Sequence, residues 1–363
     1  LSGANTYLGR TTVLGGTLEV TNLNGLGGTN FGLPNRWANL TSVNTGGTLL
    51  LNVAAGGTIT EILNLNGGTL DLRSTVATTL NAPIVLASDS RINVSNTGAA
   101  VNQLITGEIL AVPGADLTVG GVATGTPSTL VLAPAATSGA RWENTQIEAN
   151  GRLQIGNNSR GWIGSGNIVN DGTLITSTNN GNLVLANNFS GAGSFIQARN
   201  TVYLTGDNSG YTGSWTVGSV AIANAGAELR VGNDTYTGSL GSGDVTLQAT
   251  AGSSVLRTHF IADTTIANNI TLNANSTLNA HYLRQGIGNV ALTGNLTIGA
   301  NSAAAGRAIL QTEGSGILSF DGTLVGGSAT NLLNISNNGI FRFGGSASNS
   351  YHGVLGGNNV WLF

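Results

Sequence analysis

Carboxylates are the residues of this 363-residue chain whose spacing comes nearest to a catalytic pattern. Enzymes that cut polysaccharides gather several carboxylates to act as acid, base or calcium ligands. The densest acidic stretch holds Asp207, Glu228, Asp234 and Asp244. Many such enzymes also place a Lys or Arg beside the proton to be removed, and this chain has no Lys. Acids next to glycine are typical turn residues, so we expect no catalytic residues and keep a polysaccharide lyase or glycoside hydrolase as the alternative.

Residues 206–210 (Gly-Asp-Asn-Ser-Gly) come close to the turn that carries a serine-protease nucleophile. The segment is one residue too long, and the extra Asn208 would displace the backbone N–H groups of an oxyanion hole. We interpret it as a Gly-Asn turn before Tyr211.

Histidines offer a weak pattern for a metal site. The separation of His259 and His281 in sequence is close to one coil of a repeat protein, so the two would stack, while His352 lies far along the chain. Two ligands do not make a site, and the chain has no Cys to complete one. We therefore predict no metal site and no cofactor.

Aromatic residues give the best binding candidate. Trp142 and Trp162 are close enough in sequence to belong to successive coils, with Arg141 and Arg160 beside them. A coil of about 20 residues would place both tryptophans on one face, where the rings could stack on sugars. The alternative is that the two rings fill the interior, because large aromatic side chains are highly buried on average.

Composition excludes several classes of function. Charged residues make up 8% of the chain and the net charge is −3, while 40% of residues are hydrophobic, so we expect a packed core. The 13 basic residues are all Arg and are spread along the chain, which argues against nucleic-acid binding. Without Cys there is neither a disulfide nor a thiolate. No apolar run approaches the roughly 18 residues of a membrane span.

A short Gly-Gly-Thr-apolar unit recurs at residues 15–18, 46–49, 56–59 and 67–70. Between copies lie short segments that alternate apolar with polar residues, the pattern of half-buried strands. The last three copies follow one another at about half the length of a solenoid coil, so we predict an all-β parallel β-helix with coils of about 20 residues. Gly would supply positive φ at the corners, and stacked Asn side chains would form ladders there.

This prediction treats residues 1–363 as one continuous β-helix, with a protruding loop near 22–38 where glycines, Pro34 and Trp37 interrupt the pattern. Leucines that follow the Gly-Thr corner are expected to be buried. They are Leu18, Leu49, Leu70, Leu174 and Leu324.

The N-terminal residues carry a family resemblance. Residues 1–7 (Leu-Ser-Gly-Ala-Asn-Thr-Tyr), then Gly-Arg-Thr-Thr-Val and residues 15–20, resemble the autotransporter-associated β-strand repeat of bacterial passenger domains. The resemblance implies a right-handed β-helix that is secreted and lies outside the cell or on its outer surface. Because the chain begins inside a repeat, we expect it to be part of a longer protein.

The resulting functional expectation is a non-enzymatic structural or adhesive rod. Its expected partners are a surface glycan or a host or matrix ligand, and other copies of itself in a fibre or coat. Low charge leaves little repulsion to keep such copies apart.

Overall fold

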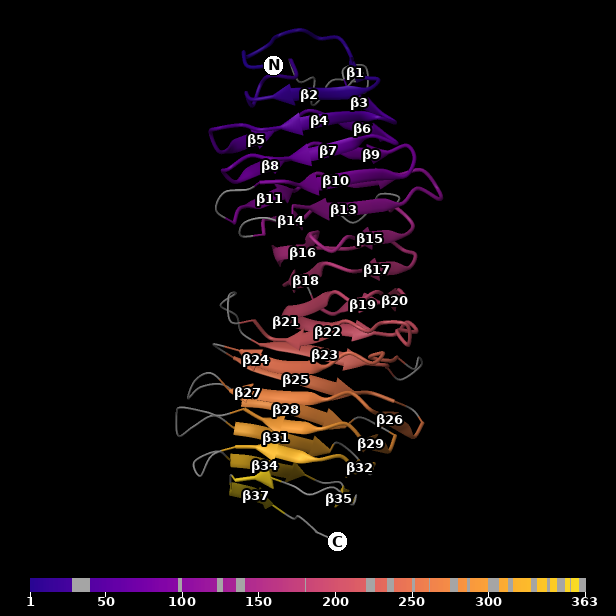
Figure 1. Cartoon of the computed structure of the whole chain (residues 1–363), viewed down its shortest axis with the longest axis vertical. Helices are drawn as coiled ribbons and strands as arrows, with labels where there is room; N and C mark the ends of the chain where they lie inside the picture. Colours follow the sequence, from indigo (N-terminus) through magenta and orange to yellow (C-terminus); the bar gives the residue numbers. More distant parts are fainter. Residues whose placement is uncertain are drawn as a thin grey trace. The chain divides into compact units, whose positions relative to one another are not determined.

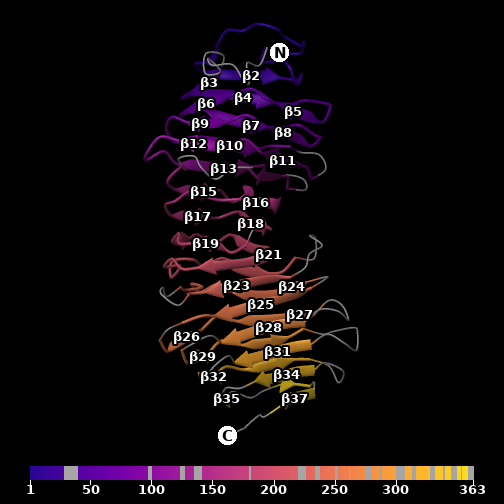
Figure 2. The ribbon, with the colours of Figure 1, turned by 180° about the vertical axis from the view of Figure 1, so that it is seen from behind.

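The computed structural model divides into two compact units, Leu1–Thr178 and Asn179–Phe363, and every regular element in its described part is a β-strand. Each unit is a β-solenoid, in which strands of successive coils pair in parallel (Figures 1 and 2). No helix among the described residues could span a membrane. The structure describes residues 1–27, 40–96, 100–122, 127–134, 141–179, 181–219, 226–233, 238–249, 252–260, 262–274, 280–285, 288–299, 307–312, 316–327, 332–337, 340–344, 350–352 and 354–358.

Unit 1 has three parallel sheets, one on each face of its coils. The first sheet contains β1 (Thr11–Val13), β3 (Thr41–Asn44), β6 (Leu63–Asn66), β9 (Ile84–Leu86) and β12 (Ile109–Ala111). The second contains β2 (Gly16–Val20), β4 (Gly47–Leu51), β7 (Thr69–Leu72), β10 (Ser90–Val94), β13 (Leu117–Gly121), β15 (Thr145–Ile147) and β17 (Ile168–Asn170). The third contains β5 (Gly57–Ile59), β8 (Thr78–Leu80), β11 (Asn102–Ile105), β14 (Thr129–Leu132), β16 (Arg152–Ser159) and β18 (Thr173–Thr178).

Unit 2 begins with β19 (Leu183–Leu185), β20 (Phe189–Ser190) and the long β21 (Ser194–Leu204). The first half of β21 starts a sheet with β22 (Ser214–Val217), β24 (Val245–Ala249), β27 (Ile270–Ala274), β30 (Leu296–Ile298), β33 (Leu324–Gly326) and β36 (Ser350–Tyr351). Its second half pairs with β19 and continues into β23 (Ala227–Val231), β25 (Ser253–Thr258), β28 (Ala280–Gln285), β31 (Arg307–Thr312), β34 (Leu332–Asn337) and β37 (Val354–Asn358). A smaller sheet contains β26 (Thr264–Ile266), β29 (Val290–Leu292), β32 (Ile317–Phe320) and β35 (Ile340–Phe343).

The parallel β-solenoid is therefore confirmed, but the predicted coil length is too short for most coils. Thr48 pairs with Thr69, which gives a coil close to the predicted length, whereas Gly16 pairs with Gly47 across a much longer one. In unit 2, Ala227 pairs with Ser254 and Ser254 with His281, so two successive coils have the same length. That length is the 27-residue separation that also joins Thr201 to Glu228. Only the copies at 46–49 and 67–70 mark a short coil, because the copy at 15–18 lies a much longer coil before them.

Two corners show why the repeat needs two glycines. Gly46 and Gly67 have φ of 80° and 79°, a conformation that costs side-chain-bearing residues energy. The glycine after each approaches the previous coil, and a Cβ on Gly47 or Gly68 would lie 2.6 Å from a carbonyl oxygen there. The first glycine therefore turns the chain, and the second lets the coils stack closely.

Asn and Asp side chains link successive coils at other corners. In unit 1, Asp116 Oδ1 accepts hydrogen bonds from the backbone and side chain of Asn144, and Asn144 Oδ1 accepts one from the backbone of Asn167. In unit 2, the Asp263 and Asn289 side chains accept in the same way from the backbones of Asn289 and Ile317. The predicted ladders thus exist, although most donors are backbone N–H groups.

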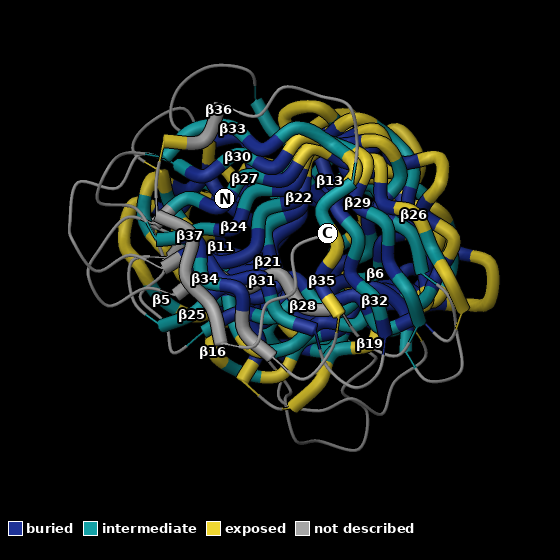
Figure 3. The backbone as a smooth tube through the Cα atoms, turned by 90° about the horizontal axis from the view of Figure 1, so that it is seen from below, coloured by how far each residue is buried: buried dark blue, intermediate teal, exposed yellow. Residues whose placement is uncertain are grey.

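Aliphatic side chains stack inside unit 1. On the second sheet Leu18, Leu49, Leu70 and Ile92 occupy one register position, and the last three are buried. Figure 3 shows the buried segments in dark blue and the exposed ones in yellow. Burial is also confirmed for Leu174 and Leu324. Leu18 is only half-buried, because β2 has β4 as its single paired neighbour among the described strands.

The core of unit 2 contains an aromatic cluster. Trp215 lies 5.8 Å, 5.0 Å and 4.8 Å, between ring centroids, from Phe189, Phe195 and Tyr211, and all four rings are buried. Trp215 Nε1 donates to the Leu240 carbonyl and the Tyr211 hydroxyl donates to that of Gly193, which satisfies both polar atoms.

The loop predicted near 22–38 falls mostly outside the described residues, which stop at 27 and resume at 40. Its described part, residues 22–27, is a turn closed by a hydrogen bond from the Gly25 amide to the Asn22 carbonyl. Leu26 in this turn is buried.

Candidate functional site

Three arginines occupy one register position in unit 2. Arg230 of β23 pairs with Arg257 of β25, which pairs with Arg284 of β28. The same position is held by Tyr203 on the preceding coil and by Gln311 on the following one. We call these five residues the arginine column. Its neighbours along the strands, such as Leu229 and Leu256, are fully buried, so the column belongs to the outer side of the sheet.

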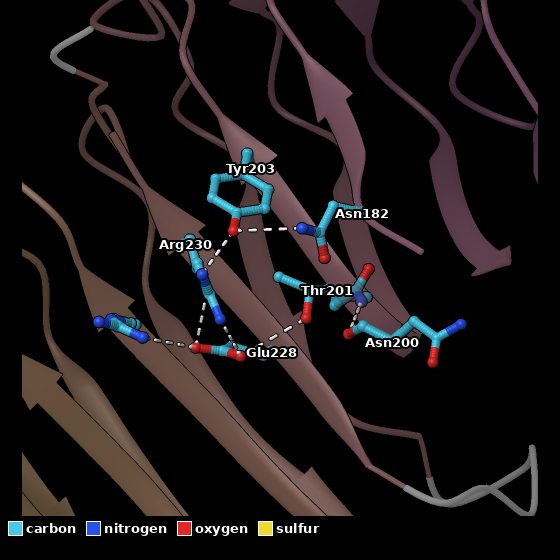
Figure 4. A network of polar contacts seen from close by, with 8 residues as sticks. Asn182, Asn200, Thr201, Tyr203, Glu228 and Arg230 are labelled. Atoms are coloured by element: carbon cyan, nitrogen blue, oxygen red, sulfur yellow. Dashed lines mark hydrogen bonds and ion pairs between the residues drawn. The ribbon is translucent and has the colours of Figure 1, made fainter. Parts of the chain in front are cut away.

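Glu228 is the charged partner of the column. Arg230 donates from Nε to Glu228 Oε1 at 2.9 Å and from Nη2 to Oε2 at 3.0 Å, a two-pronged ion pair (Figure 4). Arg257 Nη1 lies 3.9 Å from the same Oε1, and Thr201 Oγ1 donates to Oε2 at 3.5 Å. One carboxylate is thus shared by two guanidinium groups.

Tyr203, on the coil before Arg230, is a second partner of the Arg230 side chain. The Arg230 guanidinium carbon lies 4.9 Å from the centre of the Tyr203 ring, a cation–π contact, and Arg230 Nη1 also donates to the Tyr203 hydroxyl. Asn182 Nδ2 donates to the same hydroxyl at 3.4 Å. These contacts, drawn in Figure 4, fix the Arg230 side chain in one orientation.

The column is partly open to solvent. The side chains of Arg230 and Arg257 are 21% and 19% exposed, and that of Glu228 is 18% exposed. Guanidinium groups in this setting can bind carboxylate, sulfate or phosphate through paired N–H donors. The arrangement is therefore suited to holding oxyanions.

The predicted tryptophan pair exists, but inside the protein. Trp142 and Trp162 lie 5.5 Å apart between ring centroids, and they are 0% and 4% exposed. Trp142 Nε1 donates to Thr145 Oγ1, and the Arg141 guanidinium lies 5.3 Å from the Trp162 ring centre. Arg141 and Arg160 are exposed. The expectation of an open aromatic face is corrected, because the two rings fill the interior and leave no face for a sugar.

The segment that resembles a protease turn has a structural role. Asn208 is fully buried, accepts from the Phe189 amide through Oδ1 and donates through Nδ2 to the Ser239 carbonyl. The Ser209 amide donates to Asp207 Oδ1, and this hydrogen bond lowers the pKa of Asp207. Asn208 thus holds this turn against neighbouring coils.

The histidines and the acidic residues singled out in the sequence do not form a common site among the described residues. The coil register places His281 beside Ser254 and Ala308, so the predicted stack of His259 on His281 is wrong. Glu228 binds arginine, and Asp244 accepts from Asn269 Nδ2 at a corner. Asp234 lies outside the described residues. Within the described residues, no group of three or more His, Asp or Glu could hold a metal ion.

Comparison with known proteins finds no matching family model, no similar curated protein and no similar solved structure. The site must therefore be interpreted from its own geometry.

Sequence reasoning missed the arginine column. Its arginines looked isolated along the chain, but their constant separation equals the coil length in this part of the structure. That regular spacing was the available signal. Glu61 was also missed: it is 7% exposed, and burial raises its pKa to about 7 although Thr41 Oγ1 donates to it.

Proposed function

We propose that this chain is a non-enzymatic structural or adhesive body, displayed outside a bacterial cell, that binds a surface glycan or a host or matrix ligand. The proposal rests on one observation: the carboxylates of this chain bind other groups of the protein. Asp116, Asp244 and Asp263 accept hydrogen bonds that join coils, while Glu148 and Glu228 pair with arginines. These acids hold the fold together, whereas a polysaccharide-cutting enzyme needs acids that converge on substrate.

The location outside the cell rests on the resemblance of residues 1–20 to the autotransporter-associated repeat. A stacked β-solenoid supports the adhesive part, because it presents continuous faces on which the same position recurs at every coil.

Association with further copies belongs to the same proposal. With 8% charged residues and a net charge of −3, the surface offers little electrostatic repulsion between copies. Sedimentation over a range of concentrations should show species larger than the monomer, and a strictly monomeric chain would remove this part.

The functional test pairs a binding assay with a cleavage assay. The chain is applied to immobilised polysaccharides and matrix proteins, and the same polymers are assayed for new reducing ends and unsaturated products. We expect binding without cleavage. Release of either product would overturn the proposal, and loss of that release in a Glu228→Gln or Asp207→Asn variant would assign the enzyme alternative.

A further inference from the structure

The arginine column places more basic than acidic residues together on one sheet. The neighbouring outward position on the same strands is held by Thr201, Glu228, Val255, Tyr282 and Ile309. The two adjacent columns therefore contain three arginines and one carboxylate. Parallel strands are about 4.8 Å apart, so equivalent backbone positions repeat at that interval, and like charges directly opposite each other are unfavourable.

The solenoid does not require this arrangement. In unit 1 the corresponding kind of column on the second sheet contains Thr17, Thr48, Thr69, Arg91 and Thr118, with a single charge. That one arginine forms a two-pronged pair with Glu148. A comparable outer face is thus built without stacked arginines, which leaves the column in unit 2 to be explained by a ligand.

We propose that the arginine column binds a linear polysaccharide that carries one anionic group, a carboxylate or a sulfate, on each sugar. The polymer lies along the column, perpendicular to the strands, so that the anionic groups on its inward side meet the arginines. This inference rests on the proposed adhesive function and names its ligand class.

The geometry of the arginines fits this ligand. Arg230 is held by Glu228 and Tyr203, so little side-chain freedom is lost when an anion arrives. Arg257 Nη1 lies 3.9 Å from Glu228 Oε1, so the two neighbouring guanidinium groups face one carboxylate. Both side chains keep about a fifth of their surface exposed to the polymer.

A sugar chain fits better than a nucleic acid. Coils repeat at about 4.8 Å, which is close to the advance of one sugar ring, whereas phosphates on one strand of a duplex advance by about 3.4 Å. Single strands are bound largely by stacking on aromatic rings, and the one described ring in the column, Tyr203, is covered by Arg230.

The test measures binding of the full chain to polygalacturonate, dextran sulfate and neutral dextran, with all three assayed for cleavage. We expect the wild-type chain to bind one or both anionic polymers and not dextran, more weakly as salt rises. Preference for polygalacturonate identifies a carboxylate ligand, and preference for dextran sulfate identifies a sulfate ligand.

Variants with opposite expected effects on binding separate recognition from folding. Arg257→Gln should weaken binding about tenfold, since it removes one charge-assisted contact, and Arg257→Lys should fall between it and the wild type. Glu228→Gln should tighten binding about threefold, since the competing carboxylate is removed. Arg91→Gln in unit 1 is the matched control and should bind like the wild type.

Equal binding by wild type and Arg257→Gln, at matched circular dichroism spectra, would overturn the proposal, and so would weaker binding by Glu228→Gln. A single-stranded oligonucleotide that binds more tightly than both anionic polymers would also overturn it. Binding to neutral dextran alone would contradict the proposed anionic ligand of the arginine column, but it would still support the adhesive function. Cleavage of a polymer would contradict the proposed non-enzymatic function. Binding by the Arg257 and Glu228 variants would still test whether the arginine column binds an anionic polymer.

Discussion

The two units build comparable coils with different side chains inside and outside. Unit 1 stacks aliphatic residues such as Leu49, Leu70 and Ile92, and its Arg91 is matched by one Glu. Unit 2 packs an aromatic cluster around Trp215 and has three arginines at one register position, two of which share the carboxylate of Glu228. The difference shows that coil stacking fixes which positions meet, while the residue types at those positions can vary from unit to unit; we propose that the arginines of unit 2 serve recognition.

The largest effect should come from the aromatic cluster. Trp215→Ala should lower the free energy of unfolding by about 3–5 kcal/mol, because it leaves a cavity beside three rings and unpairs the Leu240 carbonyl. Denaturant titration followed by tryptophan fluorescence and circular dichroism measures the loss. Leu70→Ala is the control in unit 1, expected to cost about 2–5 kcal/mol. A smaller loss for Trp215→Ala than for Leu70→Ala would erase the contrast between the cores.

The corner ladders should contribute less to stability than the cores, in proportion to the hydrogen bonds that each side chain accepts. Asp116→Ala removes the acceptor for the Asn144 backbone and side chain and should cost about 1–3 kcal/mol. Asp263→Ala removes the acceptor for the Asn289 backbone alone and should cost about 1 kcal/mol. Thermal melts of both variants give the comparison. A larger loss of stability for Asp263→Ala than for Asp116→Ala would contradict the expectation that the loss follows the number of hydrogen bonds removed.

Sequence analysis found the features that depend on local pattern. Strand alternation and glycine corners are each visible within a few residues of sequence, and the buried positions of Leu49, Leu70, Leu174 and Leu324 followed from them. Coil length did not follow, because each corner sets it separately. An error in coil length changes which residues are expected to be neighbours on successive coils. For this reason His259 was matched with His281, and arginines one coil apart were interpreted as isolated.

The tryptophan pair failed for a different reason. A separation close to the predicted coil length brought Trp142 and Trp162 together, but spacing alone does not distinguish the inner side of a coil from the outer side. The Trp142–Thr145 hydrogen bond, which satisfies the buried indole N–H, becomes visible only in three dimensions.

Unit 1 also contains a buried carboxyl group, Glu61, which should make its stability depend on pH. Burial raises the pKa of Glu61 from 4.5 to about 7. Between these values the unfolded chain loses the proton while the folded chain keeps it, so the contribution to stability is full below pH 4.5 and falls as pH rises towards 7. Glu61→Gln should flatten this dependence in denaturation experiments at pH 5 and pH 8. An unchanged slope in the variant would assign the dependence to other groups.

The smallest effect should come from the exposed ion pair of unit 1. Arg91 and Glu148 have side chains that are 34% and 37% exposed, so Arg91→Gln should cost about 1 kcal/mol or less. A thermal melt at low and high salt measures it. A loss comparable with that of Asp116→Ala would mean that single arginines on this face have a structural role, and it would weaken the contrast with the arginine column.

The central claim is that the coil register of unit 2 stacks Arg230 directly on Arg257. Because the chain has no cysteine, engineered pairs report on this register without background. An Arg230→Cys, Arg257→Cys variant should form an intramolecular disulfide under mild oxidation, since paired Cα atoms in neighbouring strands lie about 4.8 Å apart. An Arg230→Cys, Val255→Cys variant should not, because a two-residue offset separates the Cα atoms by about 8 Å. Equal cross-linking of both pairs, or cross-linking of the second alone, would contradict the register and with it the arginine column.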